Sequence, residues 1–306
     1  MYCSLPVGCG RLADQTNPAR PARPGRPGRP GTGPRGGGRG PGGPVASGSV
    51  TAPIIPGAEP WSAPGGSHGV LVLHGFTGNP QSMRSLAQAL AAAGFTVELP
   101  LLPGHGTSVE DLIPTRWKDW SGAAEAHYQD LADRCEKVVV VGLSVGGALT
   151  CWLAEHHPEI SGVAVINPMI DPPSDEMREM GRGLLAEGVE VIDGVGSDIA
   201  KEGPVESAYP SLPLAPALSL AEGLETVVEA LSEIHCPALL LSSRVDHTVD
   251  PVSGDILVRE YGGPLERLHL EHSYHVATLD HDAALVEERV VAFARETMGG
   301  PGASPA

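Results

Sequence analysis

The fold is decided by one stretch of sequence, Lys137-Val138-Val139-Val140-Val141-Gly142-Leu143-Ser144-Val145-Gly146-Gly147. A continuous run of β-branched residues is typical of a strand that is buried on both faces of a parallel sheet. The residues that follow carry Leu149, Trp152 and Leu153 at helical spacing. The stretch therefore predicts a buried strand, a sharp turn at Ser144 and a helix.

The same alternation extends in both directions from this stretch. Short apolar runs predict strands, and the longer Ala-, Leu- and Glu-rich intervals between them predict helices. The expected strands are 69–74, 95–99, 137–143, 162–167, 237–242 and 267–271, and the expected helices are 80–93, 122–134, 145–156, 220–233, 251–260 and 282–296. These repeated units predict the α/β class, with a mostly parallel central sheet flanked by helices.

The interval from about 171 to 218 breaks this rhythm. It contains no clear strand and is rich in Pro, Gly, Glu and Met. Ligands of open α/β sheets bind outside the carboxyl ends of the strands, where a long insertion can cover them. We therefore expect a small inserted cap, or lid; a surface excursion without function is the alternative.

The two ends of the chain differ in composition from the middle. Residues 1–48 contain 13 Gly, 9 Pro, seven Arg and one Asp, a composition typical of a disordered tail. We expect the folded domain at 49–298 and a short disordered tail at 299–306. Without residues 1–48 the chain holds 13 basic and 36 acidic residues, so its charge disfavours nucleic acid and allows a neutral small-molecule substrate.

The cysteines and the hydropathy of the chain indicate its compartment. The five Cys show no spacing typical of a zinc site, and no apolar run is long enough for a membrane span or a signal peptide. We expect a cytoplasmic protein without stable membrane insertion, metal or other cofactor. The oligomeric state is left open by the sequence.

Two stretches match the pattern Gly-x-Ser-x-Gly, which marks the nucleophile of many serine enzymes. One is centred on Ser67, in a loop rich in Pro, Gly and Ser ahead of the first expected strand, where a turn residue is the simpler interpretation. The other is centred on Ser144, between a strand and a helix. The strand–turn–helix context favours Ser144 as the nucleophile, because the strained turn projects the hydroxyl group.

A nucleophilic serine needs a histidine base and an acid that orients the base, and this fold supplies them in the order Ser, acid, His. Asp246 and His275 follow expected strands in that order. Asp250 lies in the same loop as Asp246, but its place before Pro251 is explained by helix capping. A metal site at His272, His275 and Asp280 is the alternative, although no metal-binding spacing supports it.

Acyl transfer also needs donors for the oxyanion. The backbone N–H of Val145, directly after the nucleophile, is one expected donor. The second is the N–H of Phe76, in the loop His74-Gly75-Phe76-Thr77-Gly78 after the first expected strand. A turn that serves geometry alone is the other reading of this loop.

From about Ala58 to Ala294 the chain resembles the bacterial monoacylglycerol lipases and related small carboxylesterases, which have the α/β-hydrolase fold. The matching stretches are Leu73-His74-Gly75-Phe76-Thr77-Gly78-Asn79, Leu102-Pro103-Gly104-His105-Gly106, Gly142-Leu143-Ser144-Val145-Gly146-Gly147, Ala154-Glu155-His156-His157-Pro158, Asp246-His247-Thr248-Val249 and Ser273-Tyr274-His275-Val276-Ala277-Thr278-Leu279-Asp280. Val145 stands where Met is frequent in this family, and only its amide is required.

The resemblance implies Ser144, Asp246 and His275 as the catalytic triad, with the amides of Phe76 and Val145 as the oxyanion hole. It also implies that Glu206 of the cap hydrogen-bonds the glycerol hydroxyls and that Val195 borders the glycerol site. Read without the family, Glu206 is an ordinary exposed acid. We therefore expect a serine ester hydrolase that cleaves monoacylglycerols or similar short-to-medium-chain esters.

Other functions are compatible with parts of this pattern. A general carboxylesterase or an acyltransferase would use the same triad. A non-catalytic ligand-binding protein of this fold is a further alternative, although a binder has no need of a strained serine. Dehalogenases and epoxide hydrolases need an Asp nucleophile, which the Ser at position 144 opposes.

Overall fold

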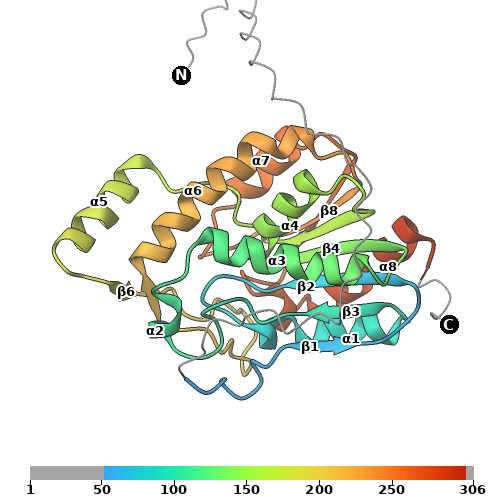
Figure 1. The fold of residues 1–306 in the computed structure, drawn as a ribbon, viewed down its shortest axis with the longest axis horizontal. Helices are drawn as coiled ribbons and strands as arrows, with labels where there is room; N and C mark the ends of the chain where they lie inside the picture. The colour runs from blue at the N-terminus through green and yellow to red at the C-terminus, as the bar shows by residue number, and fades with distance from the viewer. Residues whose placement is uncertain (1–51, 301–306) are drawn as a thin grey trace, which may run out of the picture. The chain divides into compact units, whose positions relative to one another are not determined.

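The structure is a computed structural model that describes residues 52–300. The tail expected at 1–48 lies outside the described residues, as does the tail expected at 299–306 apart from Gly299 and Gly300. Seven strands form one sheet, in the order β1-β3-β2-β4-β5-β8-β9 (Figure 1). They are β1 (Trp61–Ala63), β2 (His68–Leu73), β3 (Thr96–Leu99), β4 (Lys137–Leu143), β5 (Gly162–Ile166), β8 (Ala238–Ser243) and β9 (Leu265–Leu270).

The sheet is parallel except at one edge, where β1 pairs antiparallel with β3. The register aligns the carboxyl ends of the strands: Leu73 pairs with Gly142, Leu143 with Ile166 and Ser243 with Leu270. The loops that follow β2, β4, β5, β8 and β9 therefore all leave the sheet on one side, at the carboxyl ends of the strands. Ligands of open parallel sheets bind at these carboxyl ends.

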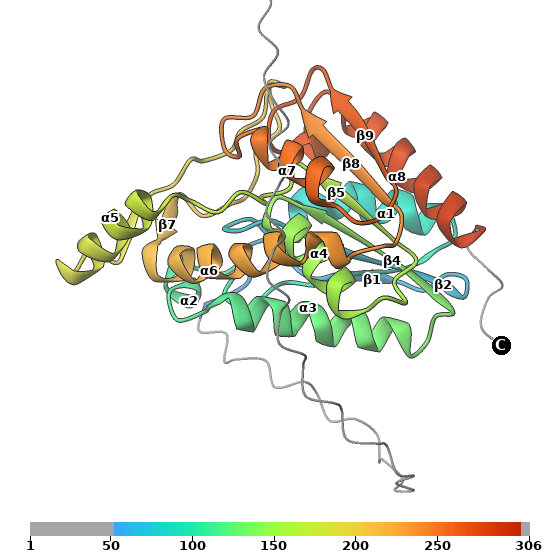
Figure 2. The same cartoon turned by 90° about the horizontal axis from the view of Figure 1, so that it is seen from above.

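Helices cover both faces of the sheet (Figure 2). They are α1 (Arg84–Ala92), α3 (Trp117–Ala132), α4 (Val145–His156), α6 (Leu214–Ala230), α7 (Val252–Glu260) and α8 (Ala283–Met298), with the short α2 (Val109–Leu112) and the 3-10 turns η1 (Pro80–Met83), η2 (Leu231–Glu233) and η3 (Ala277–Leu279). One apolar core joins the sheet to α3, α4, α6 and α7, and a second joins it to α1 and α8. The predicted mostly parallel sheet with helices on both faces is confirmed.

The interval expected to lack strands is more regular than the sequence predicted. It contains α5 (Asp175–Ala186) and a two-stranded antiparallel ribbon of β6 (Val191–Asp193) and β7 (Ser211–Pro213). Helix α6 begins at Leu214, whereas the sequence predicted a start at Leu220. Pro216 lies in its first turn, where a missing backbone N–H costs no hydrogen bond, so the proline does not exclude a helix. In Figure 1, α5 and β6 lie at the edge of the molecule, away from the sheet.

Candidate active site

The predicted nucleophile Ser144 lies in a tight turn between β4 and α4. Its backbone has φ 56° and ψ −119°, a conformation that residues other than glycine rarely adopt. A Cβ on Gly142 would lie 2.1 Å from the carbonyl oxygen of Gly146, and a Cβ on Gly146 would lie 2.3 Å from that of Leu73. The two glycines are therefore required by backbone contacts on both sides of the serine.

The second Gly-x-Ser-x-Gly match lies at the opposite edge of the sheet. Ser67 directly precedes β2, whereas Ser144 directly follows β4, and the two strands are parallel. The carbonyl of Ser67 accepts the amide of Glu136, which also precedes its strand. Ser67 is therefore remote from the loops that surround Ser144.

The predicted acid and base meet at the edge where Ser144 lies. Nδ1 of His275 donates to Oδ2 of Asp246 at 2.8 Å, and both side chains are almost fully buried, with 7% and 4% exposed. Oδ1 of Asp246 accepts the amides of Thr248 at 2.9 Å and Val249 at 2.7 Å. The Asp246 carboxylate is thus held by its own loop and by the imidazole at the same time.

The competing acid has a different environment. Asp250 is exposed, and its Oδ1 accepts the amide of Val252, the first residue of α7. This contact caps the helix, which is the role that the sequence offered as the alternative to catalysis.

The predicted oxyanion loop lies against Ser144. A Cβ on Gly75 would lie 3.3 Å from the Cβ of Ser144 and 3.8 Å from its Oγ. Val145 is the first residue of α4, so its N–H has no partner within the helix. Within residues 52–300 we find no hydrogen bond from the amide of Phe76. Both predicted donors are thus available near the serine, and the positive end of the α4 dipole adds to their effect.

Two buried histidines, His74 and His105, contact each other beside this loop. Nε2 of His74 accepts the amide of Leu102 at 3.1 Å, and its ring meets the ring of His105 edge-on at 5.1 Å. Burial, with a smaller contribution from His105, lowers the pKa of His74 to about 3. Burial lowers the pKa of His105 to about 4, against hydrogen bonds to the carbonyls of Pro103 and Leu102. Both rings are therefore neutral near pH 7 and join the oxyanion loop to the loop that contains His105.

Glu206 lies in the inserted segment 171–218, called the cap below after its predicted role, and its carboxylate reaches the same loop. A Cβ on Gly78 would lie 2.8 Å from Oε1 of Glu206, so this glycine makes room for the carboxylate. Burial raises the pKa of Glu206, and the electrostatic interaction with His275 and a hydrogen bond from the Ser82 side chain oppose the shift. Val195, the other predicted cap residue, is 67% exposed. The structure thus brings Glu206 to the site and leaves Val195 at the surface of the cap.

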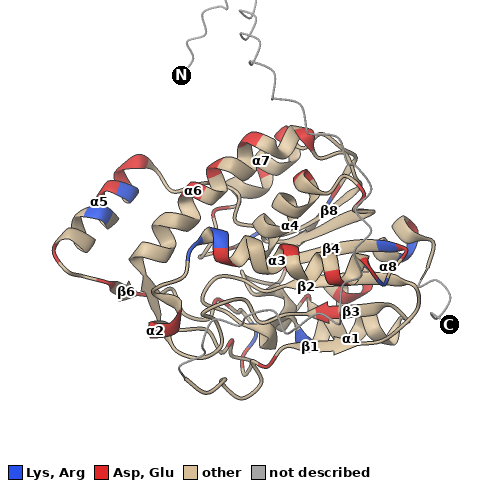
Figure 3. Cartoon of the chain, viewed as in Figure 1, with Lys and Arg blue, Asp and Glu red and all other residues tan. Residues whose placement is uncertain are grey.

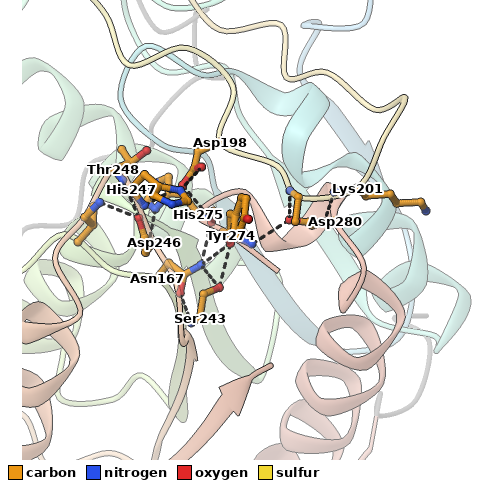
Figure 4. A network of polar contacts seen from close by, with 12 residues as sticks. Asn167, Asp198, Lys201, Ser243, Asp246, His247, Thr248, Tyr274, His275 and Asp280 are labelled. Atoms are coloured by element: carbon orange, nitrogen blue, oxygen red, sulfur yellow. Dashed lines mark hydrogen bonds and ion pairs between the residues drawn. The ribbon is translucent and has the colours of Figure 1, made fainter. Parts of the chain in front are cut away.

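Three further residues contact His275 or the preceding Tyr274, and the sequence predicted no role for two of them (Figure 4). Asn167, at the end of β5, donates to the carbonyls of His275 at 2.8 Å and Tyr274 at 3.3 Å. Asp198, in the cap, accepts the amide of His275 at 3.2 Å. Asp280 accepts the amide of Tyr274 at 2.8 Å.

The sequence carried only weak signals for these contacts. Asn167 has φ 42°, a conformation that Asn tolerates better than most residues, but nothing in the sequence joins it to a loop 107 positions later. Asp198 falls in the expected cap and Asp280 in a stretch that resembles the family, but neither position indicated a contact with the loop of His275.

Asp280 was the third member of the alternative metal site. Its carboxylate accepts four amides, those of Ala200, Lys201, Tyr274 and His281. Burial opposes ionisation of Asp280, but these hydrogen bonds outweigh it and lower its pKa. His272 is exposed, and in residues 52–300 no three His, Cys, Asp or Glu side chains are grouped as metal ligands.

The described chain carries 13 basic and 36 acidic residues, and the acidic ones are spread over its helices and loops (Figure 3). None of the helices within residues 52–300 has the length and apolar character needed to cross a bilayer.

Comparison with known proteins gives consistent results. Residues 70–288 match the model of the alpha/beta hydrolase family. The chain is 44% identical over 242 residues to a thermostable monoacylglycerol lipase of Bacillus sp. (strain H-257), covering 79% of this chain and 96% of that protein. It is 29% identical over 237 residues to a carboxylesterase of Bacillus subtilis (strain 168), covering 77% and 95%.

A solved structure from work on LipS and LipT, two metagenome-derived lipolytic enzymes, superposes with a TM-score of 0.75 at 41% identity. It covers 80% of this chain and all of that chain.

Proposed function

The chain belongs to the alpha/beta hydrolase family, and on that premise we propose that it hydrolyses monoacylglycerols through an acyl intermediate on Ser144. It is a serine ester hydrolase. The proposal concerns its substrate and the residues that carry out the reaction.

The reaction begins when His275 takes the hydroxyl proton of Ser144 and Oγ attacks the ester carbonyl carbon. The carbonyl oxygen becomes an oxyanion, which the amides of Phe76 and Val145 stabilise. The bond to the alcohol then breaks, and His275 gives its proton to the departing alcohol. Asp246 stabilises the imidazolium throughout, through the hydrogen bond at Nδ1.

The second half of the reaction regenerates the enzyme. Water gives a proton to His275 as its oxygen attacks the acyl carbon, and the bond to Ser144 breaks as Oγ takes the proton back. The products are a fatty acid and, for a monoacylglycerol, glycerol. None of these reaction steps requires a metal or a redox cofactor.

The observation that carries the choice of substrate is the position of Glu206 beside the oxyanion loop and His275. Glu206 is half-buried, and a carboxylate that is partly removed from water is costly unless hydrogen-bond donors satisfy it. The alcohol part of a monoacylglycerol carries two free hydroxyl groups, which are such donors, whereas that of a methyl ester carries none. Val195 is proposed as the aliphatic border of the same subsite, by likeness to the family.

The test compares 1- and 2-monoacylglycerols with the methyl esters of the same fatty acids, for the wild type and Glu206→Ala. A hydrogen bond to a charged group contributes about 1.5–3 kcal/mol, so kcat/KM on the glycerol esters should fall roughly tenfold to a hundredfold. The methyl esters should change less than about twofold. Glu202→Ala, at an exposed acid of the same segment, is the matched control. Equal losses on both substrate types would remove Glu206 from glycerol recognition.

We also propose a cytoplasmic location. The cysteines within the described residues, Cys135, Cys151 and Cys236, are all free thiols, which fits a reducing compartment. Fractionation of the source cells followed by ester-hydrolase assay of the soluble and exported fractions tests this assignment.

A further inference from the structure

Asp198 lies in the cap segment between β6 and β7, but its side chain points back into the domain and is only 10% exposed. Oδ2 accepts the amides of His275 at 3.2 Å and His247 at 3.0 Å. Oδ1 accepts Nδ1–H of the His247 ring at 2.8 Å. The backbone carbonyl of Asp198 accepts the amide of Val276 at 3.1 Å.

These partners belong to two separate loops (Figure 4). His247 directly follows Asp246 in the loop after β8, and His275 lies in the loop after β9. One carboxylate from the cap therefore bridges the two loops beside the 2.8 Å hydrogen bond between Asp246 and His275.

The carboxylate of Asp198 and the amide of Asn167 act on opposite sides of the same residue. Asp198 holds the N–H of His275, and Asn167 holds its C=O at 2.8 Å. When both peptide groups of His275 are held, the direction of its Cα–Cβ bond is fixed, and this restricts where the imidazole can lie relative to Asp246 and Ser144. Asn167 belongs to the sheet, whereas Asp198 belongs to the cap, so the aim of the ring depends on both parts of the fold.

The residues around Asp198 extend the same connection. The amides of Ala200 and Lys201 donate to Asp280, which lies in the same loop as His275. On the other side, Oγ of Ser197 accepts the amide of Glu206 at 3.1 Å. The residue before Asp198 thus holds the backbone of Glu206, while Asp198 itself contacts the loops of Asp246 and His275.

We infer that Asp198 is a positioning residue for the catalytic base: its carboxylate, together with the backbone contacts of residues 198–201, holds the His275 and Asp246 loops in their working arrangement. The inference rests on the proposed function, because it takes Asp246 and His275 as the acid and base. It assigns the cap segment 197–201 a part in the chemical step that is separate from substrate recognition.

The experiment measures kcat and KM on a methyl ester, which offers no hydroxyl to Glu206, well below the unfolding temperature of each variant. Asp198→Ala should lower kcat by roughly tenfold to a hundredfold, the scale expected when a catalytic group is displaced by about 1 Å, with KM within about twofold. Asp198→Asn should recover most of kcat, because its carbonyl oxygen can accept both amides and its NH2 group can face Nδ1 of the His247 ring. Asp193→Ala, at an exposed acid of β6, is the control and should leave kcat unchanged.

Asp198→Glu provides a second variant if the alanine protein does not fold. It keeps the charge but lengthens the side chain by one methylene, so its carboxylate cannot occupy the same position, and kcat should again fall. The inference is overturned if Asp198→Ala or Asp198→Glu retains the wild-type kcat, or if only KM changes. Ser144→Ala separates the two proposals: activity that survives it refutes the proposed function, whereas a loss there with normal kcat in the Asp198 variants refutes this inference alone.

Discussion

Nδ1 of His275 donates to Oδ2 of Asp246 at 2.8 Å, while Oδ1 of the same carboxylate already accepts two backbone amides. The two oxygens therefore have different partners, and neither can be replaced by a donor without loss. Replacing the Asp246 carboxylate by the isosteric amide of Asn should therefore have a specific effect on the imidazole of His275.

Asp246→Asn should lower kcat by about four orders of magnitude. The two amides of Thr248 and Val249 require an acceptor, so the NH2 group of Asn must face His275 and donate to Nδ1. The proton of the neutral imidazole then moves to Nε2, the atom that should accept from Ser144. Steady-state assay of ester hydrolysis measures the loss.

Asp250→Asn is the matched control, since it changes the same group in the same loop. Asn can still accept the amide of Val252, and kcat should stay within about threefold of the wild type. A large loss in Asp250→Asn with an active Asp246→Asn would reverse the assignment of the acid.

Gly146→Ala should destabilise the protein by about 3 kcal/mol or more, because its Cβ would lie 2.3 Å from a backbone oxygen that cannot move independently. Gly122→Ala is the opposite case. Gly122 lies in α3, and no atom lies within 4 Å of its added Cβ, so the free energy of unfolding should rise by about 0.5–1 kcal/mol. Denaturant unfolding of the two variants tests the pair, and similar effects of the two substitutions would contradict this account of the turn.

The stability of the protein should fall as the pH is lowered from 6.5 toward 4, in part because of His105. Its pKa is lowered to about 4 in the folded protein, so the unfolded chain binds a proton in this range and the folded chain does not. The contribution to stability is complete above pH 6.5 and is lost on acidification, with a slope of up to about 1.4 kcal/mol per pH unit.

His105→Phe removes the titrating group and keeps an aromatic ring beside Phe76 and Trp120. Unfolding by denaturant at several pH values should show a shallower dependence than in the wild type. An unchanged slope would mean that His105 is protonated in the folded protein.

Asn167→Asp should lower kcat by tenfold or more in a variant that still folds. Nδ2 of Asn167 donates to Oγ of Ser243 and to the carbonyls of Tyr274 and His275, and a carboxylate oxygen in its place repels both carbonyls. The His275 loop should then leave its position. Kinetics with a methyl ester, together with the rate of phosphonylation of Ser144 by a fluorophosphonate, measure the effect, and normal values for both would contradict the positional role of Asn167.

The parts of the fold that the sequence predicted well are those with a continuous apolar pattern. The bounds of β4 and α4 agree with the predicted 137–143 and 145–156, because a buried strand and a buried helix joined by one fixed turn leave little freedom. The edge strand β1 and the ribbon of β6 and β7 were missed. Each is three residues long, so its pairing partner determines it and its own residues carry almost no periodic signal.

The same distinction holds for the site. Ser144, Asp246 and His275 could be predicted because each follows a recognisable strand, and strand ends converge in a parallel sheet. The contact of Asp198 with His275 spans 77 residues and begins in a segment without periodicity. Only the folded chain shows that this acid belongs beside the triad.

The attachment of residues 198–201 to the His275 loop also limits how this enzyme can be re-engineered. A cap can be exchanged between relatives when a new substrate is wanted, and α5 and β6 lie away from the sheet (Figure 1). A chimera with its junction before Ser197 keeps Asp198, the acceptor of the His275 amide, whereas a graft that continues through Lys201 replaces this contact along with the rest of the cap. The boundary between an exchangeable module and its host therefore falls inside the cap, before Ser197, whereas the cap itself continues to about residue 218.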